Sequence, residues 1–461
     1  MEEIRKMLQE DKLKEECGIF GVYSKEDFNI ATKIYYGLCA IRHRGEESAG
    51  IAVCKEKSLK YYKDMGLVCN VFNDKTLQSL NGNVGIGHVR YSTTGLSEKI
   101  NAQPILGKFK NNIIAMGHNG NLKNARELRK CLQNKKYKFE TSIDSEVILK
   151  LVEMNQENKN LEEAILETLK LLKGSYSLAF VIENKLIGVR DPHGIRPLCM
   201  GKLGEDYILS PESCAFESLG AEFIRDVEPG EMIVINENGF KSIKLKQNFQ
   251  CNTCIFEYIY FARPDSIIDG FSVYESRVMA GKKLYEEEKI DADVVLGVPD
   301  SGIPAAEGYA EASGIPFKVV FVKNKYVGRT FIVPSQCMRQ KKVALKLNPL
   351  KSIVKGKRVI VVDDSIVRGN TSKYLVDSIR KAGAKEVHFR VASPIIKYPC
   401  YFGISTHNRG ELIGANKSVE EIKEFLGVDS LRYLSIDRLI SIFNKKKYGF
   451  CLGCFNGKYP R

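Results

Sequence analysis

The 461-residue sequence has no apolar run as long as the roughly 18 residues that cross a bilayer, which excludes a helical membrane protein. Residues 1–16, MEEIRKMLQEDKLKEE, lack the apolar core of a secretion signal, so we expect a cytoplasmic protein with reduced thiols. Zinc-finger spacings, RNP aromatic motifs, heptad arrays and internal repeats are also missing. The net charge of +14 therefore favours a small anionic ligand, and neither nucleic acid nor membrane is an expected partner.

The composition is that of a globular chain, because 44% of the residues are hydrophobic and 27% are charged. The length suggests two or three domains, each large enough for its own core. The chain has thirteen cysteines, which is a large number and an odd one. In a reducing compartment, closely spaced cysteines indicate a metal site before a disulfide.

Residues 17–245 contain short apolar runs bounded by Gly and Asn, such as CGIFGVY at 17–23 and GEMIVIN at 230–236. Their lengths and flanking turn residues predict strands. Residues 143–155 and 161–173 carry apolar side chains at a spacing of three to four, which predicts helices. This half is predicted to be an α+β domain built on antiparallel sheets.

The second half of the chain has a different pattern, in which strand-like apolar runs have helical patterns between several of them. A capping box of Ser418 with Glu421 predicts a helix that stops at Gly427. The apolar runs with helical patterns between several of them predict an α/β domain with a parallel sheet. The change of character lies near 245–255. The four runs are DVVLGVP (293–299), FKVVFV (317–322), RVIVVDD (358–364) and VHFRVAS (387–393).

The string VIVVDDSIVRGNTS, residues 359–372, is the strongest local motif. A buried strand ends in Asp363 and Asp364, and a turn leads into a helix that begins near Thr371. Backbone N–H groups of such a turn bind anions, and the carboxylates fit sugar hydroxyls, a hard divalent metal, or both. A bare pair of aspartates would more simply be an acidic turn that caps a helix.

This string resembles the PRPP-binding signature of type I phosphoribosyltransferases. The resemblance implies that Asp363 and Asp364 hold the ribose hydroxyls with Mg²⁺ alongside, and that the following turn cradles the 5′-phosphate. VPDSGIPAA at 298–306 resembles the pyrophosphate loop, with Ser301 reaching Mg²⁺. The implied phosphate contacts are Ser365, Val367, Arg368, Gly369, Asn370 and Thr371.

The basic segment 323–340 resembles the loop that closes over PRPP in this family. The resemblance implies that Lys325, Tyr326 and Arg329 contact the substrate. Closure would exclude water, which competes with transfer by hydrolysing PRPP. An ordinary basic surface loop is the alternative.

The first half contains six further motifs, which are CGIFGVY, RHRGEESAGIAV (42–53), GHVRYSTTG (87–95), GHNGNL (117–122), Asp144-Ser145-Glu146 and DPHGIRPL (191–198). Together they resemble the class II glutamine amidotransferases, which are N-terminal-nucleophile hydrolases. With the second half, nearly the whole chain resembles the amidophosphoribosyltransferase family. The implied division is a propeptide at 1–16, a glutaminase domain at 17–250 and a phosphoribosyltransferase domain at 251–461.

The family's chemistry assigns roles to five of these residues. Cys17 would attack the glutamine carboxamide, with its own α-amine as the base, so the Glu16–Cys17 bond must be cleaved. The Asn119 amide and the Gly120 N–H would bind the oxyanion. Arg90 would bind the α-carboxylate and Asp144 the α-ammonium. The alternatives without a functional role are a core thiol for Cys17, a surface side chain for Arg90 and a helix cap for Asp144.

Two CxxC pairs, Cys251/Cys254 and Cys451/Cys454, would naively form a Cys₄ zinc site. The family resemblance implies another set, because one group of amidophosphoribosyltransferases carries a [4Fe–4S] cluster on Cys254, Cys400, Cys451 and Cys454. Cys251 would then be a bystander. Zinc and no metal stay as alternatives.

The reaction implied is transfer of ammonia from glutamine to C1 of PRPP, which gives 5-phosphoribosylamine, glutamate and pyrophosphate and commits carbon to purine synthesis. The family also implies a homotetramer and feedback inhibition by purine nucleotides. Two alternatives remain at this point. A hexosamine-forming synthase would need a sugar-isomerase half, and a PRPP-sensing DNA-binding regulator would need a winged helix and no glutaminase residues.

Overall fold

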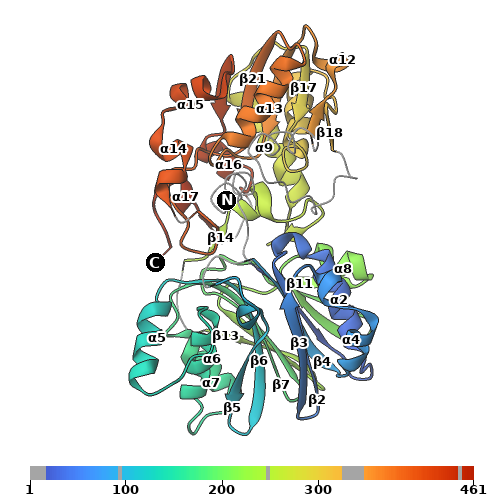
Figure 1. Ribbon diagram of the computed structural model, residues 1–461, viewed down its shortest axis with the longest axis vertical. Helices are drawn as coiled ribbons and strands as arrows, with labels where there is room; N and C mark the ends of the chain where they lie inside the picture. The colour runs from blue at the N-terminus through green and yellow to red at the C-terminus, as the bar shows by residue number, and fades with distance from the viewer. Residues whose placement is uncertain are drawn as a thin grey trace.

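The computed structural model describes residues 17–91, 96–245, 250–323, 347–406, 408–444 and 449–460. Two halves are stacked along the long axis of the molecule (Figure 1). Residues 17–245 form the lower half in that view, and the residues from 250 onward form the upper half. The predicted propeptide at 1–16 lies outside the described residues.

The lower half contains two stacked antiparallel sheets, which confirms the predicted fold class. Ile19 and Ile86 of one sheet share a buried core with Ala115 and Val181 of the other. Within the described residues the first sheet has the order β11 (Glu222–Asp226), β9 (Cys199–Leu203), β10 (Asp206–Ser210), β1 (Cys17–Tyr23), β4 (Val84–Arg90), β2 (Ser48–Lys55) and β3 (Ser58–Met65). The second has the order β13 (Gly239–Lys244), β12 (Glu231–Asn236), β8 (Lys185–Arg190), β7 (Gly174–Ile182), β6 (Asn112–Leu122) and β5 (Ile105–Phe109).

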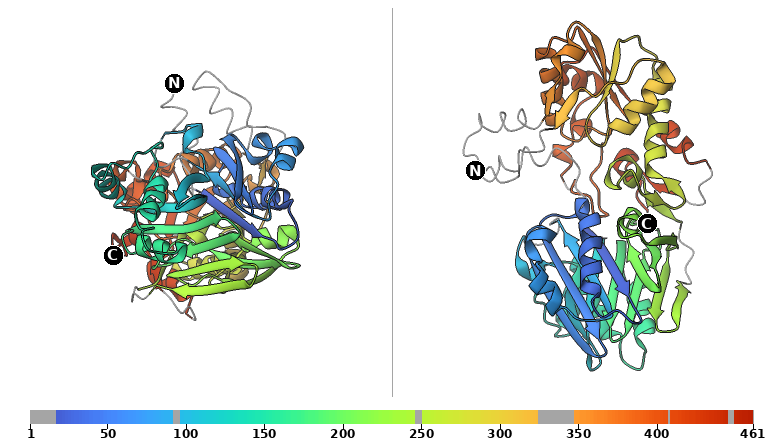
Figure 2. Two further views of the ribbon diagram at one scale, coloured as in Figure 1. Left: turned by 90° about the horizontal axis from the view of Figure 1, so that it is seen from below. Right: turned by 90° about the vertical axis from the view of Figure 1, so that its right-hand side faces the viewer.

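Helices cover the outer face of each sheet (Figure 2). Ile34 of α2 (Ile30–Ala40) and Phe216 of α8 (Cys214–Leu219) pack on the first sheet. Ile148 of α6 (Ser145–Met154) and Ile165 of α7 (Leu161–Leu169) pack on the second, so both predicted helices exist. Further helical elements of this half include η1 (Arg42–Arg44), α3 (Val68–Val71), α4 (Asp74–Ser79), η2 (Lys99–Asn101) and α5 (Ala125–Asn134).

The upper half is built on a parallel sheet, as the sequence predicts. Its order in the described residues is β17 (Val294–Gly297), β20 (Arg358–Asp363), β21 (Glu386–Val391) and β22 (Ser430–Tyr433). The capping box of Ser418 and Glu421 is present, and Gly427 ends the helix with φ of 71°. The helices are α9 (Val273–Glu287), α10 (Ile303–Ser313), α12 (Lys351–Val354), α13 (Asn370–Lys381), α14 (Ile413–Asn416), α15 (Val419–Leu426), α16 (Ile436–Ser441) and α17 (Gly453–Asn456).

The predicted strand at 317–322 is only partly correct. Phe317 forms an isolated parallel bridge with Val295 of β17, but the run then leaves the parallel sheet. Residues Phe321–Lys323 form β18, which pairs antiparallel with β19 (Leu347–Pro349). An apolar β-branched run predicts extended backbone but does not specify its partner, and here a neighbouring segment takes that role.

The chain segments around the junction join distant parts of the sequence. β14 (Asn252–Cys254) pairs in parallel with β23 (Gly449–Cys451), so the end of the chain returns to the start of the upper half. A turn of π-helix, η3 (Glu257–Phe261), and the hairpin of β15 (Ile267–Ile268) and β16 (Phe271–Ser272) follow β14. The short helix η4 (Arg409–Glu411) precedes α14. The domain boundary at 250/251 stays a prediction, since residues 246–249 lie outside the described ranges.

Candidate active sites and a cysteine cluster

Cys17 and Arg90 lie directly opposite each other in neighbouring strands. Cys17 is the first residue of β1, and its register partner is Arg90, the last residue of β4. Both side chains are buried, at 6% and 3% exposure. The surface-arginine alternative is therefore wrong for Arg90, whereas burial alone does not distinguish a nucleophile from a core thiol at Cys17.

Asn119 is fully buried in β6, and both polar atoms of its amide are without a hydrogen-bond partner among the described residues. An unpaired buried amide is costly, so it indicates a group held ready for a ligand. The next residue, Gly120, has φ of 140°, and a Cβ there would lie 2.2 Å from the Ser175 carbonyl oxygen. Only glycine fits at this position beside β7.

Asp144 stands at the N-terminus of α6, yet its carboxylate does not cap that helix. Its Oδ2 accepts a hydrogen bond from the Leu122 N–H at 2.9 Å, which ties α6 to the end of β6. The helix-capping alternative is therefore wrong. His118 Nδ1 lies 3.9 Å from Asp144 Oδ1, but burial lowers the pKa of His118, although Asp144 opposes this shift. His118 is thus neutral near pH 7 and positions its neighbours.

The buried ends of β4 and β6 are joined by polar contacts that sequence reasoning missed. His88 Nε2 contacts the His118 carbonyl oxygen at 3.0 Å, and burial lowers the pKa of His88 to about 3. Gln103 Oε1 accepts from the His118 N–H at 2.8 Å. Ser145 Oγ lies 3.0 Å from His118 Nδ1. The polar residues inside otherwise apolar strands are the only signal that could have indicated this network.

The predicted glutaminase residues face the upper half of the molecule. Near the end of β6, Asn121 donates to the Tyr401 carbonyl oxygen at 3.0 Å, and Ser175 of β7 donates to that of Phe402 at 2.6 Å. The turn beside Arg90 also reaches the upper half, through Arg44 and Glu257. Asn119, Gly120, Cys17 and Arg90 therefore lie on the same edge of the sheet sandwich.

In the upper half, the two predicted substrate loops touch each other. Ser301 Oγ donates to Asp364 Oδ1 at 2.5 Å, and Ser365 Oγ donates to Asp364 Oδ2 at 2.6 Å. A Cβ at Gly302 would lie 2.7 Å from the Val362 carbonyl oxygen and 3.1 Å from Asp363 Cα, so the loops meet backbone to backbone. The three carboxylate and hydroxyl groups assigned to Mg²⁺ and ribose thus share one edge of the parallel sheet.

The turn after Asp364 leads into α13 as the motif predicts. Gly369 stands at the N-cap position with φ of 85°, and Asn370 and Thr371 begin the helix. Val367 is buried, and Arg368 reaches Glu411 with its guanidinium. The other assigned contacts of the covering loop, Lys325, Tyr326 and Arg329, lie outside the described residues.

Arg277 of α9 is a further residue beside this site that the sequence did not single out. It is buried, and it lines the cavity that also contains Ser301, Asp364 and Tyr258. Its Nε donates to the Tyr258 carbonyl oxygen and its Nη2 to that of Ala262, both at 2.8 Å. A lone arginine in a helix of mixed composition carries no local signal of this role.

Four cysteines line one cavity between the C-terminal segment and the start of the upper half. They are Cys254, Cys400, Cys451 and Cys454, and Arg196 lines the same cavity. Cys254 and Cys451 are register partners of β14 and β23, and the Phe402 N–H donates to Cys400 Sγ at 3.3 Å. The cysteines of the described ranges form no disulfide with one another. Burial raises the pKa of Cys254 and Cys454, and the neighbouring thiols raise it further.

In the described part of the chain, no group of three or more His, Cys, Asp or Glu side chains has the arrangement to hold a metal ion. No helix among the described residues is long and apolar enough to cross a membrane.

Family models match both halves of the chain. Residues 88–218 match a glutamine amidotransferase domain, and residues 277–393 match a phosphoribosyl transferase domain. Together with the antiparallel sandwich, the parallel sheet and the two sets of site residues, these matches define the class: an enzyme in which a glutamine amidotransferase is joined to a pentosyltransferase.

The comparisons with whole proteins are more specific. The chain is 50% identical to the amidophosphoribosyltransferase of Methanocaldococcus jannaschii, over 96% of this chain and 97% of that protein. A solved allosteric regulatory enzyme of purine biosynthesis superposes with a TM-score of 0.91 at 45% identity, covering 96% of both chains. Glutamine PRPP amidotransferase from Bacillus subtilis, complexed with ADP and GMP, gives 0.90 at 44% identity, over 96% of this chain and 97% of that one. The chain belongs to the amidophosphoribosyltransferase family.

Proposed function

We propose that Cys17 becomes the first residue of the mature chain when residues 1–16 are removed, and that its thiol then attacks the carboxamide of glutamine. The free α-amine takes the thiol proton and passes it to the departing nitrogen, so ammonia leaves as the C–N bond breaks. Water then hydrolyses the thioester to glutamate. The pairing of Cys17 with Arg90 supports this proposal, because the guanidinium is a suitable partner for the α-carboxylate.

The observation that carries the glutaminase proposal is the buried amide of Asn119, whose polar atoms have no hydrogen-bond partner among the described residues. The attack on the carboxamide creates an oxyanion, and a preorganised donor stabilises that charge without reorganisation. Asn119 Nδ2 would donate one hydrogen bond and the Gly120 N–H another. Asp144, anchored by the Leu122 N–H, would hold the α-ammonium group.

In the upper half, Asp363 and Asp364 would bind the ribose hydroxyls of PRPP, and the turn from Ser365 to Thr371 would bind its 5′-phosphate. Mg²⁺ would be held by Ser301, Asp363 and Asp364 together with substrate oxygens, since Mg²⁺ usually takes one or two carboxylates and substrate phosphates. The bound ion would neutralise charge on the leaving pyrophosphate. The hydrogen bond from Ser301 to Asp364 supports this assignment.

Ammonia from the first site would attack C1 of PRPP, and the bond from C1 to the pyrophosphate oxygen would break. Ammonia released into water would be protonated and lose its nucleophilic lone pair. An internal transfer between the halves avoids that loss. The product, 5-phosphoribosylamine, is the first committed intermediate of purine synthesis.

We further propose that Cys254, Cys400, Cys451 and Cys454 hold a [4Fe–4S] cluster. The buried Cys254, Cys400 and Cys451 and the partly buried Cys454 line one cavity, which supports this, because a cluster takes four thiolates and stabilises the deprotonated form that burial opposes. A cluster also fills a larger space than one zinc ion, which needs its thiolates to converge. The group would be structural, joining the end of the chain to the start of the upper half.

The same proposal includes a homotetramer, feedback inhibition by purine nucleotides and a cytoplasmic location. The complex of the Bacillus subtilis relative with ADP and GMP supports the proposed feedback inhibition by purine nucleotides. The lack of disulfides among the described residues supports a reducing compartment.

The first experiment is intact mass and N-terminal sequencing of protein purified without oxygen, with iron content and visible absorption measured on the same sample. We expect a chain that starts at Cys17 and carries about four irons. A chain that retains residues 1–16 should have ammonia-dependent but no glutamine-dependent activity. Full glutamine activity in the uncleaved chain would overturn the assignment of Cys17.

A further inference from the structure

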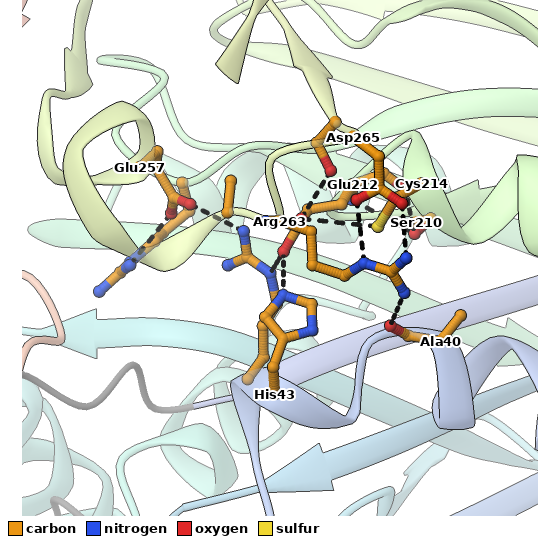
Figure 3. Close-up of polar contacts among 12 residues, drawn as sticks. Ala40, His43, Ser210, Glu212, Cys214, Glu257, Arg263 and Asp265 are labelled. Atoms are coloured by element: carbon orange, nitrogen blue, oxygen red, sulfur yellow. Dashed lines mark hydrogen bonds and ion pairs between the residues drawn. The ribbon is translucent and has the colours of Figure 1, made fainter. Parts of the chain in front are cut away.

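A chain of buried charges crosses from the lower half to the upper half (Figure 3). Arg44, in the short helix η1, contacts Glu212 through Nε and donates from Nη2 to Glu257 Oε2 at 2.7 Å. All three side chains are at 0% exposure. Glu257 Oε1 faces Arg196 Nη1 at 3.5 Å. One arginine of the glutaminase half is thus held by a carboxylate that belongs to the other half.

Glu212 holds the upper half as well. Its Oε2 accepts from Ser266 Oγ at 2.7 Å and from the Arg263 N–H at 2.8 Å, and His43 Nε2 lies 2.6 Å from its Oε1. Burial by itself would raise the pKa of Glu212, but Arg44 and His43 hold that pKa well below its usual value. The carboxylate is therefore charged, and the segment from η3 to Ser266 is attached to the turn that contains Arg44.

The residues that follow Arg44 pack directly on the predicted glutamine site. A Cβ at Gly45 would lie 2.8 Å from the backbone nitrogen of Arg90, so this turn touches Arg90 without a side chain between them. The Glu47 N–H donates to the Arg90 carbonyl oxygen at 2.9 Å. Ser48 is the register partner of Arg90 on one side, and Cys17 is its partner on the other. A shift of Arg44 would therefore move the backbone that carries Arg90.

The other end of the charge chain borders the predicted PRPP site. Glu257 begins η3, and Arg277 donates to the carbonyl oxygens of Tyr258, within η3, and of Ala262, directly after it. Arg277 and Tyr258 line the cavity that contains Ser301 and Asp364. The turn η3 thus borders the predicted PRPP site through Tyr258 and contacts Arg44 through Glu257.

We infer that Arg44 is a positioning residue for glutamine binding, and that Glu257 sets its position from the phosphoribosyltransferase half. This inference rests on the proposed role of Arg90 as the partner of the glutamine α-carboxylate. Neither residue touches substrate. Their effect is on the KM for glutamine, because a displaced Arg90 weakens binding of the amino-acid group and leaves the thiol of Cys17 unchanged.

The test is Glu257→Gln, with Asp269→Asn as the matched control. Asp269 pairs with Arg190 at 2.8 and 3.2 Å, and both side chains are buried. That pair also joins the two halves, but its arginine belongs to β8 rather than to the turn beside Arg90. Each substitution thus removes one charge from a buried arginine–carboxylate contact across the same interface.

We expect Glu257→Gln to raise the KM for glutamine roughly tenfold, a usual size for coupling between sites. Asp269→Asn should leave that KM within about twofold, because the coupling needs contact with the turn beside Arg90. Ammonia-dependent synthesis of phosphoribosylamine should stay unchanged in both variants. Alkylation of Cys17 by a diazoketone analogue of glutamine should slow in Glu257→Gln, while alkylation by iodoacetamide, which needs no amino-acid recognition, should not.

Two results would overturn the inference. One is a wild-type KM in Glu257→Gln together with a lowered melting temperature, which would make the charge chain purely structural. The other is an equal rise in KM in both variants, which would assign the effect to general loosening of the interface. If Glu257→Gln does not fold, Arg44→Lys replaces it, because an ammonium cannot span both carboxylates as the guanidinium fork does. A wild-type KM in folded Arg44→Lys would equally overturn the inference.

Arg90→Gln, measured in parallel, separates this inference from the proposed function. An unchanged KM for glutamine in Arg90→Gln would refute the assignment of Arg90 itself. A raised KM in Arg90→Gln with an unchanged KM in Glu257→Gln would refute only the positioning role.

Discussion

Two buried cysteines in the same sheet of the lower half differ in what surrounds them. Cys17 begins β1 opposite Arg90, whereas Cys54 lies inside the core near the end of β2. Burial, and then the charge of Glu183, raises the pKa of Cys54 to about 11, so this thiol is inert near pH 7.

We predict that Cys17→Ala abolishes glutamine-dependent synthesis but leaves ammonia-dependent synthesis intact, because only the first site uses the thiol. Cys54→Ala should retain both activities and lose about 1–2 kcal/mol of stability through the small cavity. Steady-state assays with each nitrogen source and thermal melting check this. Residual glutamine turnover in Cys17→Ala would rule out Cys17 as the nucleophile.

The amide of Asn119 allows a prediction that separates catalysis from stability. Asn119→Ala should lower kcat for glutamine hydrolysis by about 10²–10³-fold, the usual loss for one oxyanion donor. Its polar atoms have no partner in the described part of the protein, so the substitution breaks no hydrogen bond there. Removal of the unpaired buried amide offsets the cavity that the truncation leaves, so the melting temperature should stay near that of the parent. A strong loss of stability with normal kcat would instead make Asn119 a structural residue.

At the scale of elements, most strands follow from the sequence because their apolar residues are contiguous. β1, β12 and β20 coincide with predicted runs to within a residue or two. The segment at 317–322 was assigned to the parallel sheet and instead pairs mainly with β19. β-Branched composition favours extended backbone equally in any sheet, so pairing is decided by neighbours in space, here a strand more than twenty residues further along the chain.

The contact between the two substrate loops depends on Gly302. We predict that Gly302→Ala raises the KM for PRPP roughly tenfold or more, because a Cβ 2.7 Å from the Val362 carbonyl oxygen forces the loops apart. The overpacking should also cost about 1–3 kcal/mol of stability. Glutamine hydrolysis assayed without PRPP is the internal control. A normal KM for PRPP would mean that the loops can separate without harm to the site.

At the scale of the whole molecule, the four-cysteine cavity ties the end of the chain to the start of the upper half. We predict that Cys254→Ser loses the bound iron and lowers the melting temperature, because the pairing of β14 with β23 loses its cross-link. Cys251 stands three residues earlier and outside the cavity lining, so Cys251→Ser should keep the iron and the melting temperature of the parent. Iron analysis and melting in the absence of oxygen test this. Equal iron content in the two variants would refute the proposed ligand set.

The interface also contains a carboxyl group with a raised pKa. Burial, and then the charge of Asp269, raises the pKa of Asp226 from 3.8 to about 6. Between these values the folded state binds a proton that the unfolded state has lost. The stability contributed by the protonated form is thus present at low pH and declines as the pH rises through about 6.

We therefore predict that Asp226→Asn stabilises the protein at pH 8 by about 1–3 kcal/mol relative to the parent, and that the gain shrinks toward pH 4. Denaturant unfolding across this range measures it. A gain that does not depend on pH would show that Asp226 does not titrate in this window.

The class of enzyme was predictable because its motifs are short contiguous strings. The residues around Cys17, Asn119 and Asp363 each form a local pattern with a recognisable use, and the alternation of strands and helices separates the two halves. The supporting residues were not predictable. Gln103, Arg277 and Glu257 stand in segments whose composition is ordinary for a strand end, a helix and a turn.

Local patterns in this chain thus specify the elements, the two halves and the candidate site residues, since each depends on residues close together in the sequence. The partners across the interface follow from how those elements dock. Arg44 meets Glu257 across 213 positions of sequence, and 70 basic and 56 acidic residues offer far too many possible pairs for charge alone to select one. Burial of both sheets and the return of the C-terminal segment bring that pair together and exclude water from it, which gives the contact its strength.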